Sequence, residues 1–220
     1  MSAIWGISAL ASIGGAVASL VVLTQAMTAQ PGVHLFTWHP ILMMAAFTLL
    51  GPSAAIFVQA RKATTNSSTR FGLILAHASL QWTAAACAAG GFYAVYEHKD
   101  AKGYGHFTSL HSRVGLAAMG MYAGAMMYAA FRTTTNKNFS MLWSDVMHRI
   151  GGVFAVSVGA AAVCTGILHE RWTPPNMATQ TQQLIAGAAV LGALTVAVGF
   201  VMPPGAAAED THDKKATKAD

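Results

Sequence analysis

The stretch Leu35–Phe47 reads LFTWHPILMMAAF and places an ionisable imidazole, His39, just inside a long apolar run. An ionisable side chain within a membrane span is costly, and it normally faces the interior of a helix bundle, where it has a partner. Three other apolar runs each contain a histidine in a similar position: His77, His111 and His148. The sequence therefore predicts a membrane bundle in which four helices each contribute one inward-facing imidazole.

The composition is typical of a multi-span membrane protein. Of the 220 residues, 54% are apolar and only 10% are charged, which is far from the average of soluble domains. The formal charge of +5 comes mostly from residues between the apolar runs and in the tail, so it indicates membrane topology and not nucleic-acid binding. Cys87 and Cys164 each lie in an apolar run, and we expect them to be small buried side chains and not a disulfide.

Six apolar segments are each long enough to cross roughly 30 Å of hydrocarbon at about 1.5 Å per residue. We expect an all-α protein, a six-transmembrane-helix bundle over residues 1–202, followed by a disordered cytosolic tail over residues 203–220. The first segment lacks the basic residues that begin a signal peptide, so we expect it to be a span. The predicted spans are Ile4–Met27, Phe36–Ala60, Phe71–Tyr96, Phe107–Phe131, Leu142–Leu168 and Gln183–Val201.

Lysine and arginine are distributed unevenly between the two sides of the predicted bundle. Eight lie on the side of the second and fourth loops and the tail, and three lie on the other side. Because cytosolic loops are enriched in these residues, the chain termini are expected to be cytosolic. The eight are Arg61, Lys62, Arg70, Arg132, Lys137, Lys214, Lys215 and Lys218, and the three are Lys99, Lys102 and Arg171.

Depth along the spans sorts the four intramembrane histidines into two pairs. The second and fourth spans enter from the outer side, so His39 and His111 share the outer half; the third and fifth enter from the cytosol, so His77 and His148 share the inner half. The sequence separations agree, at 72 residues for the outer pair and 71 for the inner pair. We expect one pair above the other, with about 10 to 20 Å between them.

Paired imidazoles without a deep carboxylate favour a haem iron over a metal that the protein holds alone. A protein-only metal site usually needs three or four ligands, and the nearest carboxylate, Asp145, precedes His148 by one turn. In a haem the porphyrin fills the equatorial positions and two imidazoles fill the axial ones, which favours electron transfer over oxygen binding. Gly115 and Gly152, one turn after His111 and His148, leave room for a flat ring.

On these residues the chain resembles the cytochrome b561 family, in particular its short six-helix members, over about residues 1–202. The resemblance implies two b-type haems per chain in a four-helix core formed by spans two to five, with His39 and His111 binding the outer haem and His77 and His148 the inner one. It also implies a transmembrane oxidoreductase that transfers electrons from cytosolic ascorbate to monodehydroascorbate or a ferric chelate, and a possible homodimer. The motifs that carry it are LFTWHPILM around His39, the run from His77 to EHKD at His98, HFTSLHSRVG from His106 to Gly115, and MHRIGG around His148.

Candidate substrate residues lie on both sides of the membrane. On the outer side, His98, Lys99 and His106 cluster between the third and fourth spans; the family pattern favours the two histidines as acceptor contacts, while a solvated loop is the alternative for the lysine. On the cytosolic side, many family members have lysines before the third-span histidine, but here the segment is RFGLILAHAS, with only Arg70 at its boundary. Arg149 is the other cation expected near the donor or the haem propionates.

Two other functions remain open at this stage. A quinone-linked cytochrome b subunit of a larger respiratory complex commonly takes two haem ligands from one helix, whereas each helix here supplies one. A histidine-based metal-ion transporter is expected to have midplane carboxylates and broken helices, which the sequence lacks. Trp82, Phe47 and Tyr122 are candidates to lie between the histidine pairs, with plain packing as the alternative. Plasma membrane, vacuole and endosomal vesicle are all compatible locations.

Overall fold

The computed structural model describes residues 2–28, 34–136, 142, 145–169 and 178–201. The regular elements among them are all helical, and six helices are long and apolar enough to cross a membrane. The predicted all-α, six-span fold is therefore confirmed. The predicted tail, residues 203–220, and five of the cations behind the predicted orientation (Lys137, Arg171, Lys214, Lys215 and Lys218) lie outside the described residues.

The six spans are built from seven α-helices and one π-helical segment. The second span changes its helical pitch near the middle, where the π-helical segment joins two α-helices. Pro40, which cannot donate a backbone hydrogen bond, and Pro52 flank this change. In order, the elements are α1 (Ser2–Thr28), α2 (Leu35–Met44), the π-helical segment (Ala45–Leu50), α3 (Gly51–Ala63), α4 (Ser67–Lys102), α5 (Leu110–Asn136), α7 (Val146–Ile167) and α8 (Thr179–Val201).

The third and fourth spans differ most from the predicted bounds. α4 continues past the apolar run to Lys102 because the residues EHKDAK are compatible with a helix, and it stops at Gly103, which has φ 67°. α5 begins only at Leu110, after Ser109 accepts a hydrogen bond from the backbone N–H of Ser112 at 3.2 Å. The predicted start of the fourth span at Phe107 is therefore three residues early, and Phe107 lies with His106 in the loop that joins the two helices.

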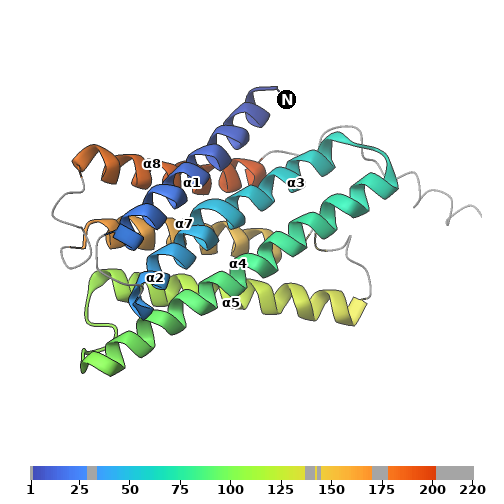
Figure 1. Ribbon diagram of the computed structural model, residues 1–220. Coiled ribbons are helices and arrows are strands. Elements are labelled where there is room, and N and C mark those ends of the chain that lie inside the picture. Colours follow the sequence, from blue (N-terminus) through green and yellow to red (C-terminus); the bar gives the residue numbers. More distant parts are fainter. Residues whose placement is uncertain (1, 29–33, 137–141, 143–144, 170–177, 202–220) are drawn as a thin grey trace, which may run out of the picture.

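The spans form two layers of three (Figure 1). In one layer α1, the second span and α4 pack side by side, and in the other α8, α7 and α5 do so. The layers meet mainly where α8 packs against α1 and α3, whereas α4 and α5 make little direct contact. Because the spans alternate in direction, the start of α1 lies at the same end of the bundle as the end of α8.

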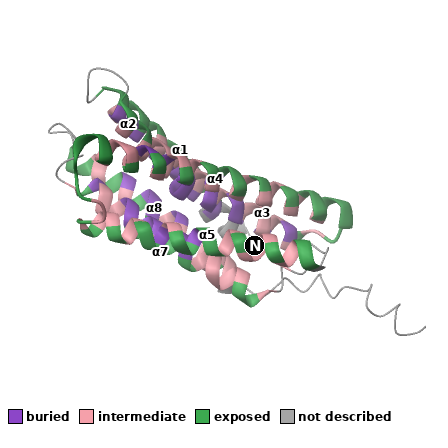
Figure 2. Cartoon of the chain, turned by 90° about the horizontal axis from the view of Figure 1, so that it is seen from below, coloured by how far each residue is buried: buried purple, intermediate pink, exposed green. Residues whose placement is uncertain are grey.

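Buried positions lie along the helix sides that face the interior of the bundle (Figure 2). Many of them are alanine, whereas many large apolar residues are exposed. Ala84, Ala88 and Ala155 have no exposed surface, and small residues of this kind let membrane helices approach closely. Gly15 of α1 is the extreme case, because a Cβ there would overlap the Thr48 carbonyl of the second span. The outward-facing apolar surface is what a lipid bilayer requires of a spanning bundle.

The three aromatic candidates between the histidine pairs do not share one environment. Phe47 and Tyr122 are 5% and 7% exposed, and their rings pack edge to face at 5.6 Å between centroids. Trp82 is 54% exposed, so neither a place between the pairs nor a packing role in the core fits it. Sequence depth alone could not decide this, because depth does not say which side of a helix faces the core.

Candidate functional site

The outer histidine pair is formed by α2 and α5. The rings of His39 and His111 lie 6.0 Å apart between centroids, at an interplanar angle of 78°. Nδ1 of His39 donates to the Gly91 carbonyl and Nδ1 of His111 donates to the Ala162 carbonyl, both at 2.9 Å. Since a carbonyl oxygen can only accept a hydrogen bond, the proton of each ring is on Nδ1. The lone pair of Nε2 is therefore available to coordinate a metal ion.

The inner pair is formed by α4 and α7 and has similar geometry. The rings of His77 and His148 lie 6.5 Å apart between centroids, at 81°. Nδ1 of His77 donates to the Ala54 carbonyl of α3 at 3.1 Å. Nδ1 of His148 is buried and has no hydrogen-bond partner within the described part of the chain. Three of the four rings are therefore oriented by a backbone carbonyl of a neighbouring helix, and His148 is not.

The distance between the two levels follows from residue counts along the helices. On α4, His77 lies 14 residues before Gly91, whose carbonyl binds His39; on α7, His148 lies 14 residues before Ala162, whose carbonyl binds His111. At about 1.5 Å per residue, each interval is about 21 Å along the helix axis. This value is at the upper end of the predicted separation, and the agreement of both helices shows that the two layers repeat one arrangement.

A cavity of about 1080 Å³ surrounds the outer pair. It is lined by His39, His111, Gly115 and Gly166 and, at its mouth, by the more exposed loop 103–109. A Cβ at Gly115 or at Gly152, near the inner pair, would meet no atom within 4 Å. Apolar walls, paired imidazoles and open space beside glycines are what an axially ligated, flat prosthetic group requires.

The donor set also argues for a group that brings its own equatorial ligands. The described residues contain no cluster of three or more histidine, cysteine, aspartate or glutamate side chains able to hold a metal ion. Each level offers two imidazoles, which suffice for the axial positions of a haem iron but fall short of the ligands that a protein-only site usually has. The residues present therefore fit b-type haem.

Residues 38–174 match the profile of the family described as eukaryotic cytochrome b561. The chain belongs to the cytochrome b561 family. It is 38% identical over 166 residues to the transmembrane reductase CYB561D2 of Bos taurus, an alignment that covers 72% of this chain and 74% of the relative. The protein of the same name from Homo sapiens is 30% identical over the same shares of the two chains.

A more distant relative carries a more specific name. The lysosomal membrane ascorbate-dependent ferrireductase CYB561A3 of Mus musculus is 26% identical over 176 residues, 77% of this chain and 72% of the relative. Together with the six apolar helices, these similarities make the chain an integral, multi-pass membrane oxidoreductase. Membership of a cytochrome b family implies b-type haem, and the predicted family is confirmed.

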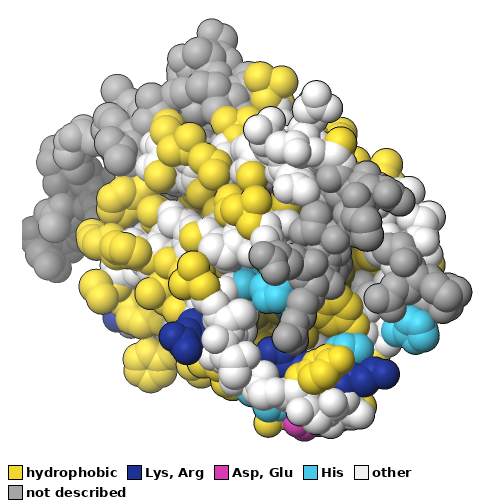
Figure 3. Space-filling model, turned by 90° about the vertical axis from the view of Figure 1, so that its left-hand side faces the viewer, with side chains coloured by type: hydrophobic (Ala, Val, Ile, Leu, Met, Phe, Trp, Pro, Cys, Tyr) yellow, Lys and Arg dark blue, Asp and Glu magenta, His cyan; other side chains and the backbone are white. Residues whose placement is uncertain are grey.

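The predicted acceptor residues of this cytochrome b561 lie at the mouth of the outer cavity, on the face shown in Figure 3, where histidine and lysine side chains gather. The ring of His106 pairs with Asp100 at 2.7 Å, and Lys99 Nζ donates to the Gly105 carbonyl at 3.3 Å. These two side chains hold the loop 103–109 against the end of α4. His98 instead packs on the ring of Phe36 at 5.1 Å between centroids, and Phe36 stacks on His39 at 5.9 Å.

One outer-cavity residue escaped the sequence analysis. His169 follows α7, lines the cavity and places its ring 6.4 Å from that of His111 between centroids. From sequence it is only a histidine at a loop edge. One indication of its position was available from the sequence: the fifth span is predicted to end on the outer side, which is also the side predicted for His111 of the fourth span.

Two cations at the end of the bundle that was predicted to be cytosolic contact the end of α8. Arg149 donates to the Phe200 carbonyl, and its guanidinium lies 4.7 Å from the centroid of the Phe200 ring. Lys62 Nζ donates to the Gly199 carbonyl at 3.0 Å. Cations stabilise a helix C-terminus, where carbonyls have no intrahelical partner. Arg70, the other predicted donor contact, lies in the first turn of α4.

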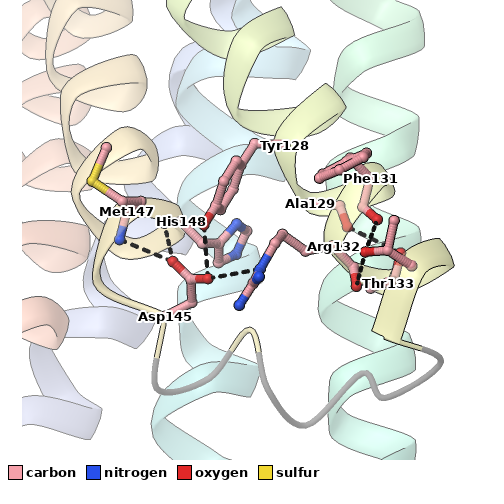
Figure 4. A network of polar contacts seen from close by, with 9 residues as sticks. Tyr128, Ala129, Phe131, Arg132, Thr133, Asp145, Met147 and His148 are labelled. Carbon is pink, nitrogen blue, oxygen red and sulfur yellow. Dashed lines mark hydrogen bonds and ion pairs between the residues drawn. The ribbon is translucent and has the colours of Figure 1, made fainter.

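Asp145 links the end of α5 to the start of α7 (Figure 4). Its Oδ1 accepts from the backbone N–H groups of Met147 and His148 at 3.0 and 3.1 Å, which caps α7. Its Oδ2 accepts from the Tyr128 hydroxyl at 2.8 Å and forms an ion pair with Arg132 at 3.2 Å. Burial alone would raise the pKa of this carboxyl, but these four partners together hold the pKa below its ordinary value.

Proposed function

We propose that this chain transfers electrons across the membrane from cytosolic ascorbate to monodehydroascorbate or a ferric chelate on the opposite side, with both termini in the cytosol. The observation that carries the proposal is the arrangement of two imidazole pairs at two depths, each pair with one member from each layer of helices. Two b-type haems bound there would supply one-electron chemistry without an open coordination position. The names of the relatives, transmembrane reductase and ascorbate-dependent ferrireductase, support ascorbate as the donor and a ferric acceptor.

The protein's own contribution is to orient three of the four histidines. The rings of His39, His111 and His77 each donate Nδ1–H to a backbone carbonyl, which leaves Nε2 available for a haem iron and would make the imidazole a stronger ligand. The carbonyls belong to helices next to the ligand helices, so the ring orientation depends on helix packing. In this proposal His39 and His111 bind the outer haem, and His77 and His148 the inner one.

On the acceptor side, the outer cavity is the proposed route by which an anionic electron acceptor reaches the outer histidine pair. Among the predicted acceptor contacts, His98 is linked to the pair by ring contacts through Phe36. Lys99 and His106 keep the loop 103–109 in place over the cavity, and Lys99 adds positive charge to its mouth. On the donor side, Arg70 and Arg149 are proposed to attract the ascorbate anion to the cytosolic end.

Haem content and redox titration of the purified full-length chain test the proposal. The expected result is two haems per chain with two midpoint potentials. His39→Ala should leave one haem, and the remaining potential should be that of the inner site. His34→Ala, which changes an exposed histidine just before α2, is the matched control and should keep both haems. Retention of two haems by His39→Ala would refute the assignment of the outer pair.

Substrates are tested separately in vesicles. Protein reconstituted into liposomes that contain ascorbate should reduce an external ferric chelate, and should do so without a partner protein. A purified chain that binds two haems but needs a quinone or a second subunit for any turnover would contradict the proposed donor and acceptor and leave the haem assignment intact.

A further inference from the structure

The four histidines are not held in the same way. Three of them have a ring N–H that donates to a backbone carbonyl, and His148 lacks such a bond within the described residues. Yet His148 needs a defined orientation as much as its partner His77, because their rings face each other at 6.5 Å. Some other feature must fix its position.

The carboxylate of Asp145 is the feature that the structure offers. His148 is the third residue of α7, and its backbone N–H is bonded directly to Asp145 Oδ1. The carboxylate is itself fixed, because Tyr128 and Arg132 of α5 occupy its other oxygen and only 9% of the side chain is exposed. The Asp145 carboxylate therefore connects the first turn of α7 to α5 (Figure 4). It thereby fixes the backbone position from which the His148 side chain extends.

The same group sets the charge beside the inner pair. Asp145 and Arg132 form an ion pair at 3.2 Å, so neutralising one member changes the net charge beside His148 in the opposite sense to neutralising the other. Electrostatic effects between charges within a few ångströms are strong where water is largely excluded. A gain of net positive charge favours the reduced state of a nearby redox group, and a gain of net negative charge favours the oxidised state.

We propose that Asp145 is a positioning residue for the inner haem: its carboxylate orients His148 through the first turn of α7 and, balanced by Arg132, sets the midpoint potential of the inner site. This inference rests on the proposed two-haem function. It assigns Tyr128 and Arg132 the role of holding the carboxylate in place, and it predicts opposite effects for the two members of the ion pair.

Two substitutions separate position from charge. Asp145→Asn keeps an oxygen that can cap α7 but removes the charge, and Arg132→Gln removes the opposite charge. We expect both variants to keep two haems, with the inner midpoint potential shifted upward in Asp145→Asn and downward in Arg132→Gln, and the outer potential unchanged. Asp145→Ala removes the cap as well, and its haem content should fall from two towards one per chain with loss of the inner site.

The matched control is Asn66→Ala. Asn66 caps α4 at the same end of the bundle by accepting from the Thr69 N–H at 3.0 Å, so its loss removes an equivalent hydrogen bond from a helix that carries His77. This variant should keep both haems and both potentials. If Asp145→Asn and Arg132→Gln shift neither potential, or shift the inner one in the same direction, the inference is wrong. A wild-type chain without two haems would instead overturn the proposed function.

Discussion

Gly166→Ala tests the geometry of the outer pair most directly. Gly166 of α7 faces the His111 ring, and a Cβ there would lie 2.8 Å from Cε1 and 3.0 Å from Nδ1. Carbon atoms in contact prefer about 3.5–4.0 Å, so the ring has to move by about 0.7 Å. Such a shift would stretch the 2.9 Å bond from Nδ1 to the Ala162 carbonyl to about 3.6 Å, which is no longer a hydrogen bond.

The expected outcome is the loss of one haem. Metal–ligand distances tolerate deviations of about 0.2 Å, less than a third of the forced movement, so His111 should leave the outer iron while His77 and His148 are undisturbed. Haem content should fall from about two to about one per chain, and redox titration should show the inner potential alone. Gly187→Ala is the control: a Cβ at Gly187 in α8 meets no atom within 4 Å, and alanine favours a helix by up to about 1 kcal/mol over glycine.

If Gly166→Ala binds two haems and the outer potential is unchanged, the reasoning is refuted. Either the His111 ring then does not face Gly166 in the loaded protein, or His111 is not an axial ligand. A loss of both haems would point to a general folding defect, and the melting temperature of the unloaded variant, compared with that of the Gly187→Ala control, distinguishes this case.

Three further substitutions probe the cavity, the core and the α1 interface. Gly115→Leu fills open space, so the unloaded protein should melt within a few degrees of wild type while the outer haem is lost; an unchanged haem content would contradict the proposed position of the ring. Tyr122→Phe removes the 2.6 Å hydrogen bond to Gln81 Oε1 and should lower the free energy of unfolding by about 1–3 kcal/mol, measured by denaturant titration in detergent, whereas no loss would mean that water replaces the hydroxyl. Gly15→Ala should destabilise the protein by about 1–3 kcal/mol because the added Cβ overlaps the Thr48 carbonyl. Thermal unfolding of this variant, compared with that of Gly187→Ala, checks the prediction. If the two variants are equally stable, α1 can shift relative to the second span without cost.

The sequence predicted the spans and the histidine pairs because both depend on simple physical rules. Apolar length sets a membrane span, and an intramembrane imidazole is too costly to occur without a role. The pairing of His39 with His111 required only alternating helix direction and counting. These rules act on residue type and order, which are visible in any sequence.

The parts that sequence missed depend on packing and on backbone atoms. The carbonyls of Gly91, Ala54 and Ala162 orient three rings, but every residue has a carbonyl, so nothing in the side-chain sequence marks these. The fourth span was predicted to begin at Phe107 because span prediction counts apolar residues, whereas the helix bounds are set by Gly103 and the caps. Arg149 was expected near the donor or the propionates, and its side chain reaches the end of α8 because the fold brings that carbonyl within range.

The weak contact between α4 and α5 has a consequence for how the protein is assembled. Each imidazole pair takes one member from each layer, so in the proposed two-haem protein each haem would cross-link the two layers of helices. Two such cross-links at different depths would keep the layers from sliding or turning relative to each other. The protein contacts between the layers lie mainly where α8 meets α1 and α3, so haem binding is expected to stabilise the association of the layers during membrane insertion.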